Sequence, residues 1–319
     1  MKKVLLTKKV GEKNLALLEK TAEVLNVPEG DVDALKGLLK DIDAVVLGTS
    51  FKFTGEIIDC APRLKVISRT GVGVDNVDVK AATEKGILVL NTPEANSVSV
   101  AEHTVALIAG ISKQLVFMDS ELRKGNFKAR RLEIAADMSG KTLGLVGCGR
   151  IGRMVAKKCI AAFDMRAIGY DPYLTDCEGI RMCGSIEEVF RDADYISLHL
   201  PFDSSTRNLV GENLLSLMKP DAYLINTARG GIVDEKALAE KLRTNKIAGA
   251  ALDVFASEPP ESTNELLTLP NIILTPHTAA LTRECTERVA YEAVKGVVDY
   301  LEGKTPKYVF NKEVLKSKG

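Results

Sequence analysis

A glycine-rich turn inside one apolar stretch limits what this chain can fold into more than any other feature. Residues 141–152 read KTLGLVGCGRIG, and the apolar pattern resumes over residues 153–160. This is the pattern of a strand, a tight turn and a helix. Gly147 allows a sharp turn off the strand, Gly149 allows a pyrophosphate to approach the backbone, and Gly152 allows the helix to pack closely. Free N–H groups and the helix dipole favour an anion there.

The residues that follow the turn indicate which nucleotide binds. A second apolar run, residues 166–170, ends in Asp171, about twenty residues after Gly152. A carboxylate at that spacing accepts hydrogen bonds from both ribose hydroxyls of an adenosine. An ordinary βαβ turn with an acid at the strand end is the weaker alternative. Pro172 follows Asp171 in place of an arginine that could pair with a 2′-phosphate. The sequence therefore predicts NAD rather than NADP.

Composition and charge exclude several classes of protein. A chain of 319 residues is long for a single core, so two domains are expected. Lys plus Arg and Asp plus Glu each total 43, which leaves no overall field to attract nucleic acid or an anionic membrane. The six cysteines show no C-x-x-C pair and are expected to be reduced core residues, and no metal-ligand cluster is seen. Without a signal peptide or a membrane-length apolar run, we expect a cytoplasmic protein.

The first hundred residues predict a compact α/β domain with a parallel sheet. Within it, residues 68–78 form a strand end, two glycines and a helix start, where ligands collect in such sheets. A plain glycine turn with a helix cap explains that stretch about equally well. Residues 98–116 then predict one long helix that is apolar on most of its surface, so its own domain or another subunit must cover it on several sides. The basic residues 122–131 are expected to form a solvated loop.

From residue 141 a second βα series predicts a doubly wound nucleotide-binding sheet. A last helix over residues 282–301 and a lysine-rich tail follow, and the tail is expected to return to the first domain. Six strands are expected, at residues 143–146, 166–170, 195–200, 222–227, 248–254 and 272–275.

The chain contains three histidines, so each can be weighed on its own. His103 falls in the long apolar helix and is expected to be structural. His199 ends a strand beside the expected nicotinamide or ribose site, where we expect it at most to position other residues of the site. His277 stands just past the carboxyl end of a strand, which is where such sheets bind ligands. It is the strong candidate for a proton donor.

Two other strand ends carry charges that would converge on the same crevice. Arg229 could grip a carboxylate with its planar fork, and Glu258 could hold and stabilise a charged His277 imidazole. Asp253 lies at the end of the strand that precedes Glu258. Salt bridges between strand ends would explain Arg229 and Glu258 about as well.

Together these motifs resemble the D-2-hydroxyacid dehydrogenase family over nearly the whole chain. The glycine-rich turn with Asp171 is joined by NTARGG at residues 226–231, by ALDVF at 251–255 with EPP at 258–260, and by TPHT at 275–278. Three segments are most similar to the 3-phosphoglycerate dehydrogenase branch: RTGVGVDNVD at residues 69–78, KGILVLNTP at 85–93 and ARGGIVDE at 228–235.

The resemblance implies a fold and a set of roles. It implies two doubly wound parallel-sheet domains: a Rossmann domain of residues 98–284 is inserted into a flavodoxin-like substrate domain of residues 1–97 and 285–319. It also implies a cleft between the two domains and a homodimer formed through the long helix near His103. His277 would exchange the proton, Glu258 would be its partner, and Arg229 would anchor the substrate carboxylate and carbonyl oxygen. Backbone N–H groups of Val72 and Gly73 would complete the carboxylate pocket. The NAD site would be lined by Gly147, Gly149, Arg150, Ile151, Gly152, Asp171, Leu200, Thr227, Ala228, Arg229, Asp253, His277 and Ala280.

The resemblance also implies a reaction, hydride transfer between nicotinamide C4 and C2 of a D-2-hydroxy or 2-keto acid. The expected activity is that of 3-phosphoglycerate dehydrogenase. Two alternatives stay open: a reductase of hydroxypyruvate or glyoxylate, and a non-enzymatic NAD(H)-sensing scaffold like the corepressors that share this fold. A substrate phosphate would meet Arg69 and Lys52, with help from Arg130 and Arg131, but Gly48 stands where this branch usually has another arginine. The chain is also too short for the C-terminal regulatory region of longer relatives, so serine feedback is not expected.

Overall fold

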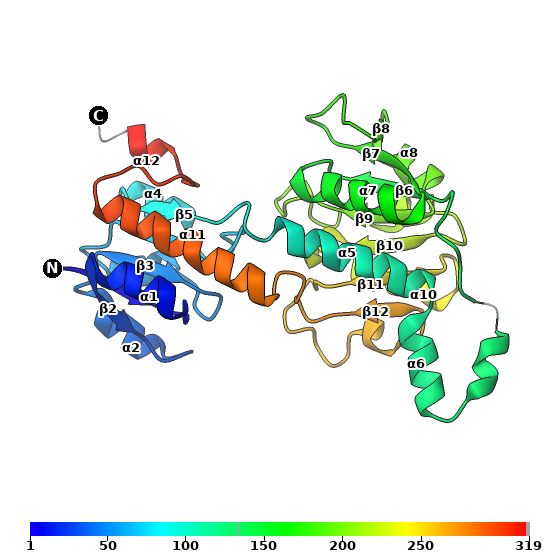
Figure 1. Cartoon of the computed structure of the whole chain (residues 1–319), viewed down its shortest axis with the longest axis horizontal. Coiled ribbons are helices and arrows are strands. Elements are labelled where there is room, and N and C mark those ends of the chain that lie inside the picture. The colour runs from blue at the N-terminus through cyan, green and yellow to red at the C-terminus, as the bar shows by residue number, and fades with distance from the viewer. Residues whose placement is uncertain (133, 317–319) are drawn as a thin grey trace. The chain divides into compact units, whose positions relative to one another are not determined.

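The computed structural model describes residues 1–132 and 134–316, which form two compact units, each built on a parallel sheet (Figure 1). Unit 1 comprises Met1–Asn96 and the chain from Leu281 onward, and unit 2 comprises Ser97–Ala280. The prediction of two parallel-sheet α/β domains is confirmed. The chain enters unit 2 at Ser97 and leaves it at Ala280.

The sheet of unit 1 has the strand order β2-β1-β3-β4-β5, which is the flavodoxin-like order. All of its strand pairs are parallel. The direction of winding reverses between β1 and β3, so the carboxyl ends of these two strands form a switch point of the kind at which ligands bind. The strands are β1 (Lys2–Leu6), β2 (Ala22–Asn26), β3 (Ala44–Leu47), β4 (Val66–Arg69) and β5 (Leu88–Leu90).

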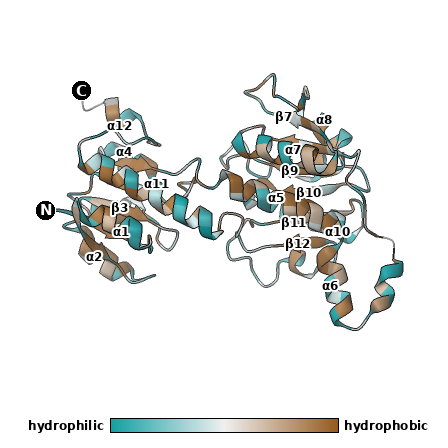
Figure 2. Ribbon diagram, in the orientation of Figure 1, coloured by the Kyte–Doolittle hydropathy of each residue, from teal (hydrophilic) through white to brown (hydrophobic). Residues whose placement is uncertain are grey.

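Helices cover both faces of this sheet because its strands alternate their apolar side chains. Leu5 of β1 packs in a core with residues of α2, α3 and α4, whereas Val4 and Leu6 pack in a second core with α1 and α11. The helices are α1 (Glu12–Glu19), α2 (Val32–Leu39), α3 (Gly55–Asp59), α4 (Val79–Glu84), α11 (Arg283–Leu301) and α12 (Glu313–Lys316). Figure 2 shows that α1 and α11 each carry both apolar and hydrophilic residues.

The C-terminal tail completes unit 1 along its edge strand. The Phe310 N–H donates to the Val89 carbonyl at 2.8 Å, and the buried Asn311 side chain accepts from the Val89 N–H at 2.8 Å. Asn311 also donates to the Ile87 carbonyl at 2.9 Å. The tail therefore satisfies backbone groups that an edge strand would otherwise leave open.

The sheet of unit 2 has the order β12-β11-β10-β9-β6-β7-β8, and all of its strand pairs are parallel. This is the Rossmann order with one added strand. The two-residue β8 was not among the six expected strands. The strands are β6 (Thr142–Val146), β7 (Arg166–Tyr170), β8 (Arg181–Met182), β9 (Tyr195–Leu198), β10 (Tyr223–Asn226), β11 (Gly249–Leu252) and β12 (Ile272–Leu274). The helices are α5 (Ser97–Ser112), α6 (Leu115–Arg123), α7 (Arg150–Phe163), α8 (Ile186–Asp192), α9 (Glu212–Leu215) and α10 (Glu235–Arg243), with 3-10 turns η1 (Phe127–Arg131), η2 (Gly230–Ile232) and η3 (Glu265–Thr268).

Two local expectations were wrong between residues 98 and 131. The long helix breaks after α5, because Gln114 adopts a left-handed φ of 52° and the chain continues as α6. The basic stretch is not a loop. Its first part belongs to α6, where Asp119 and Arg123 form an ion pair at i,i+4 spacing, and its last part forms η1. No residue of α6 is buried, and in Figure 1 the helix stands away from the body of unit 2.

All six cysteines are free thiols, and five are buried, whereas Cys60 is partly exposed. Burial raises the pKa of Cys148 and Cys159 to about 12, so both stay protonated at neutral pH. Within residues 1–132 and 134–316, no helix is long and apolar enough to cross a membrane.

Candidate active site

The predicted dinucleotide turn lies at the carboxyl end of β6, beside the end of β9. A Cβ atom on Gly147, whose φ is 95°, would lie 2.5 Å from the His199 carbonyl oxygen. A Cβ on Gly152 would lie 2.4 Å from the Gly147 carbonyl oxygen, so the first turn of α7 packs directly on the glycine turn. A Cβ on the exposed Gly149 would meet no atom within 4 Å. Packing therefore requires glycine at positions 147 and 152, whereas Gly149 leaves the backbone of the turn open to solvent or a ligand.

The start of α7 is suited to an anion. Gly149 is its N-cap residue and makes no side-chain cap hydrogen bond. The backbone N–H groups at a helix start with no such cap point toward solvent or a ligand, and the dipole of this 14-residue helix adds partial positive charge. Arg150 is exposed and Ile151 is half-buried on this first turn.

Asp171 stands at the end of β7 next to the glycine turn. Its Oδ2 accepts from the Cys148 N–H at 2.9 Å, and its Oδ1 accepts from the Tyr173 N–H at 2.9 Å. These two bonds fix the carboxylate, and each oxygen keeps a second lone pair for a ribose hydroxyl. The position and orientation of Asp171 therefore fit the diol of an adenosine ribose.

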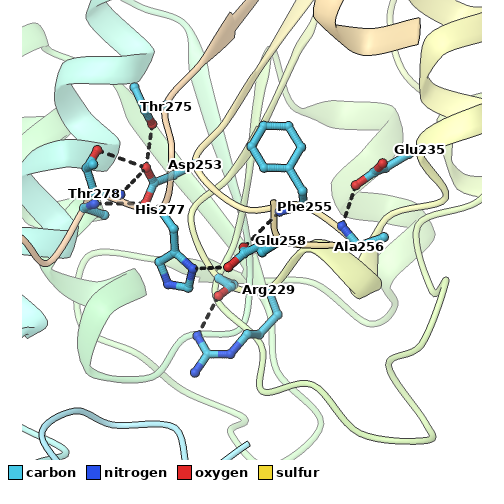
Figure 3. Close-up of polar contacts among 11 residues, drawn as sticks. Arg229, Glu235, Asp253, Phe255, Ala256, Glu258, Thr275, His277 and Thr278 are labelled. Atoms are coloured by element: carbon cyan, nitrogen blue, oxygen red, sulfur yellow. Dashed lines mark hydrogen bonds and ion pairs between the residues drawn. The ribbon is translucent and has the colours of Figure 1, made fainter. Parts of the chain in front are cut away.

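A His–Glu pair lies at the ends of β11 and β12, near Arg229 (Figure 3). His277 Nδ1 and Glu258 Oε2 are 2.7 Å apart, and both side chains are partly exposed. Burial alone would raise the pKa of Glu258, but the His277 hydrogen bond, the Phe255 N–H and the charges of His277 and Arg229 together lower it. Glu258 is therefore a carboxylate at neutral pH. It can accept a hydrogen bond from the Nδ1–H of His277 and stabilise a charged imidazole.

Arg229 is held in place by the loop after β10. Its Nη1 donates to the Ala228 carbonyl at 2.8 Å, and the backbone there is fixed by Asn226, which is 1% exposed. Asn226 donates to the Arg229 carbonyl at 2.9 Å and accepts from the Ala228 N–H at 3.0 Å. The half-buried guanidinium is thus presented at the same sheet edge as His277 and Glu258.

Asp253, which is among the residues expected to line the NAD site, is fully buried under the loop after β12. Its Oδ1 accepts from the Thr278 N–H at 2.8 Å, and its Oδ2 accepts from the Ala279 N–H at 2.9 Å. Its carbonyl oxygen accepts from the His277 N–H at 2.8 Å. His277 has a left-handed φ of 53°, which is uncommon for a residue with a Cβ and persists where neighbouring groups enforce it.

The other expected cofactor residues lie at the same carboxyl edge. Thr227 is buried, and its hydroxyl lies 2.8 Å from that of Thr104 in α5. Leu200, Ala228 and Ala280 are half-buried. His199 lies beside the glycine turn, its Nε2 is 2.9 Å from Ser197 Oγ, and burial lowers its pKa to about 4, so it is neutral at physiological pH.

In unit 1, the residues expected to bind substrate lie at the end of β4 and in the loops after β3 and β4. Arg69 is half-buried and donates to the Thr70 carbonyl at 2.8 Å, while Val72 and Gly73 are half-buried in the next loop. The Asn91 side chain donates to the Val72 carbonyl at 2.8 Å and fixes that loop. Lys52 is exposed in the loop after β3. The exposed Arg130 and Arg131, the expected helpers, lie in unit 2 on η1.

The structure gives a reason for glycine at position 48. A Cβ there would lie 2.9 Å from the Lys8 Cβ, with the Lys8 Cδ at 3.5 Å. The stem of Lys8 therefore runs across the place where a side chain at residue 48 would begin, after the neighbouring strands β1 and β3. Sequence reasoning did not consider Lys8, although its position two residues after β1 was a usable signal. It also missed Asn226, whose position at a strand end gives no sign of its buried bonds.

In the described part of the chain, no group of three or more His, Cys, Asp or Glu side chains is arranged to hold a metal ion. A Rossmann-order sheet, a glycine turn at its switch point, a carboxylate fixed beside that turn and a His–Glu pair at the same sheet edge are features of the class of nicotinamide-dependent dehydrogenases.

Comparison with known proteins gives the family. Residues 105–279 match the model of the D-isomer specific 2-hydroxyacid dehydrogenase NAD-binding domain. The chain is 41% identical over 315 residues to D-3-phosphoglycerate dehydrogenase of Methanocaldococcus jannaschii, covering 98% of this chain and 60% of that protein. It is 39% identical over 282 residues to hydroxypyruvate reductase of Thermotoga maritima, covering 88% of this chain and 90% of that protein.

A solved structure, the TT0316 protein of Thermus thermophilus, matches with a TM-score of 0.90 and 36% identity over 97% of this chain and 99% of that one. The chain belongs to the D-isomer specific 2-hydroxyacid dehydrogenase family and carries its NAD-binding domain. The predicted family and cofactor domain are thereby confirmed.

Proposed function

We propose that the chain catalyses NAD-dependent interconversion of a D-2-hydroxy acid and its 2-keto acid. The observation that carries this proposal is the 2.7 Å contact between His277 Nδ1 and Glu258 Oε2 at the sheet edge that also presents Arg229. When bound, NAD accepts or supplies the hydride at nicotinamide C4. The residues of the chain bind and orient the acid and move one proton.

The contact with Glu258 supports a role for one ring atom of His277 in the proton transfer. Because Nδ1 of His277 faces Glu258, Nε2 is the atom left to exchange a proton with the substrate oxygen. In reduction, Nε2–H donates to the carbonyl oxygen as hydride reaches C2, and the imidazolium becomes neutral. In oxidation, neutral Nε2 takes the hydroxyl proton as hydride leaves C2. Arg229 would hold the substrate carboxylate and polarise the carbonyl.

We assign NAD as the preferred dinucleotide. The fixed Asp171 carboxylate would accept from the ribose diol and would repel a 2′-phosphate at the same place.

For the substrate we propose 3-phosphoglycerate and 3-phosphohydroxypyruvate. The similarity to the Methanocaldococcus jannaschii enzyme supports this choice, although the chain spans only 60% of that protein. In unit 1, Arg69 is the proposed phosphate ligand, the Val72 and Gly73 N–H groups the carboxylate ligands, and Lys52 a further cation. Lys8, which crosses Gly48, is a further candidate cation at the switch point.

A reductase of hydroxypyruvate or glyoxylate is the second candidate. It is favoured by the match to the Thermotoga maritima hydroxypyruvate reductase over 90% of that protein's length and by the absence of an arginine at Gly48. The deciding experiment compares kcat/KM with NADH for 3-phosphohydroxypyruvate, hydroxypyruvate and glyoxylate. A preference for the phosphorylated acid supports the first proposal, and a preference for either other acid supports the second. Tight NADH binding with no turnover of any 2-keto acid would favour the NAD(H)-sensing scaffold.

We further propose that the protein forms a homodimer, and we place the contact in the segment around α6, which follows the helix near His103 where the resemblance puts it. Large apolar side chains are exposed there, with Leu115 and Val116 at 58%, Leu122 at 59% and Phe127 at 65%. Exposed apolar groups gathered in one segment mark interaction surfaces. Light scattering should give the mass of two chains, and a Leu122→Glu, Phe127→Glu variant should give one. A monomeric wild-type protein would refute the dimer. We place the protein in the cytoplasm, in accord with its six free thiols.

A further inference from the structure

His103 of α5 reaches the loop that carries His277, although the two belong to distant parts of the sequence. His103 Nε2 lies 3.0 Å from the Thr275 hydroxyl oxygen and 3.5 Å from Asp253 Oδ1. The His103 side chain is 23% exposed, whereas the Asp253 side chain is 1% exposed. A helix side chain therefore meets a buried carboxylate through one threonine hydroxyl.

The hydrogen-bond directions follow from the single proton of that hydroxyl. Thr275 donates it to Asp253 Oδ1 at 2.6 Å, so the Thr275 oxygen can only accept from His103. His103 must then carry its proton on Nε2. The chain of donors runs from His103 to Thr275 and from Thr275 to Asp253.

The same carboxylate fixes the loop after Thr275. Asp253 accepts from the N–H groups of Thr278 and Ala279, and its carbonyl oxygen accepts from the N–H of His277 (Figure 3). These bonds hold His277 in its left-handed conformation. That conformation sets the direction in which the imidazole leaves the backbone toward Glu258.

We propose that His103 is a positioning residue for proton transfer. Its Nε2–H, donated to Thr275, completes the network that holds the His277 loop against α5 and keeps the imidazole aligned with Glu258. This inference rests on the proposed function, in which His277 exchanges the proton. A loss of alignment lowers the rate of the chemical step, because proton transfer depends strongly on the geometry of donor and acceptor.

The test uses substitutions that separate the donor from the bulk of the side chain. His103→Leu removes the donor, and His103→Gln retains an amide N–H near the place of Nε2. Thr275→Val removes the hydroxyl at nearly constant shape. Glu102→Ala is the control, since Glu102 lies beside His103 on α5 and its carboxylate forms a 3.1 Å ion pair with Lys158, away from Thr275 and Asp253 in the sequence. For each variant we would measure kcat, KM for the keto acid, NADH affinity and thermal stability.

We expect His103→Leu and Thr275→Val each to lower kcat by roughly 10- to 100-fold with NADH affinity little changed. His103→Gln should recover most of the rate, and the double variant should be no worse than either single one, because both remove the same link. Unchanged kcat in His103→Leu, no recovery by glutamine, or multiplicative losses in the double variant would each overturn the proposal.

A spectroscopic readout distinguishes this failure from a failure of the proposed function. With three histidines in the chain, the ring resonances can be assigned by single substitutions. The Nδ1–H signal of His277, protected by Glu258, should weaken in His103→Leu and return in His103→Gln. A His277 signal that is identical in wild type and His103→Leu contradicts the positioning role, whether or not any keto acid is turned over.

Discussion

His277 Nδ1 lies 2.7 Å from Glu258 Oε2, although 19 residues separate them in the sequence. The pair forms because the loops after β11 and β12 start from neighbouring parallel strands, whose register aligns Leu252 with Leu274. Glu258 keeps its charge because the surrounding donors outweigh the effect of burial on its pKa. The sheet thus sets side by side the two groups that we propose for proton transfer.

Replacing His277 with Asn should lower turnover by roughly 10²–10⁴-fold, because general acid–base catalysis contributes about that much. Glu258→Gln should cost less, since the imidazole remains and only its charged partner is lost. NADH affinity, measured by fluorescence titration, should change little in both. His277→Asn with near wild-type turnover would show that another group moves the proton.

Replacing Asp171 with Asn should relax the preference for NAD over NADP. The amide oxygen can still accept from the Cys148 N–H, so the glycine turn keeps its support, while the bond from the Tyr173 N–H and the negative charge are lost. Asp171→Ala should in addition weaken NAD binding, because the ribose diol loses its acceptor. Titration of both variants with both cofactors checks this. Unchanged selectivity and affinity would remove Asp171 from the ribose site.

Two glycines of the turn should respond differently to alanine. At Gly149 the new Cβ meets no atom within 4 Å, so Gly149→Ala should fold normally but bind NAD more weakly, because the methyl group occupies the path of the pyrophosphate. At Gly152 the Cβ would lie 2.4 Å from a backbone oxygen, so Gly152→Ala should also lower the free energy of unfolding, by about 1–3 kcal/mol. Urea unfolding and NADH titration separate the two effects. Equal stability of both variants would contradict the packing argument.

The stability of the protein should depend on His199 at mildly acidic pH. Burial lowers the pKa of His199 from 6.5 to about 4, so the unfolded chain binds more protons between these values. Stability from the neutral ring is therefore complete above pH 6.5 and falls as the pH drops toward 4, by about 3 kcal/mol in all. We would measure how much more stable the wild type is than His199→Gln, as a free energy of unfolding, at pH 7 and at pH 4.5. This difference should be smaller at pH 4.5 by most of these ~3 kcal/mol. A constant difference would show that His199 is not buried as a neutral group.

Replacing Arg69 with Ala should raise KM for 3-phosphohydroxypyruvate far more than KM for hydroxypyruvate, because only the phosphate loses a charge-assisted hydrogen bond. Lys65→Ala is the matched control, since this exposed cation lies just before the amino end of the same strand. Lys8→Ala tests whether the cation over Gly48 contributes as well. Equal effects of Arg69→Ala on both substrates would move the assignment to the reductase branch.

Much of the fold could be predicted because its signals are local. Apolar runs of strand length alternate with helical patterns along the chain, and the confirmed pair of parallel sheets follows from that alternation. The glycine turn and Asp171 depend on one βαβ unit, and strand ends in a parallel sheet share an edge whatever the distant contacts are. For the same reason Arg229, Glu258 and His277 could be named as candidates, and their roles stay predictions.

Tertiary structure decided what depends on residues far apart. The His103–Thr275 bond spans 172 positions, and nothing near either residue marks it. Asp253 could be placed at a strand end from its sequence, but its burial under the His277 loop depends on where β11 and β12 lie together. Lys8 over Gly48 likewise requires β1 and β3 to be neighbours. A local pattern sets the backbone's preferred conformation, whereas the partner of each buried polar group is set by which distant segments the packed core brings within hydrogen-bond distance.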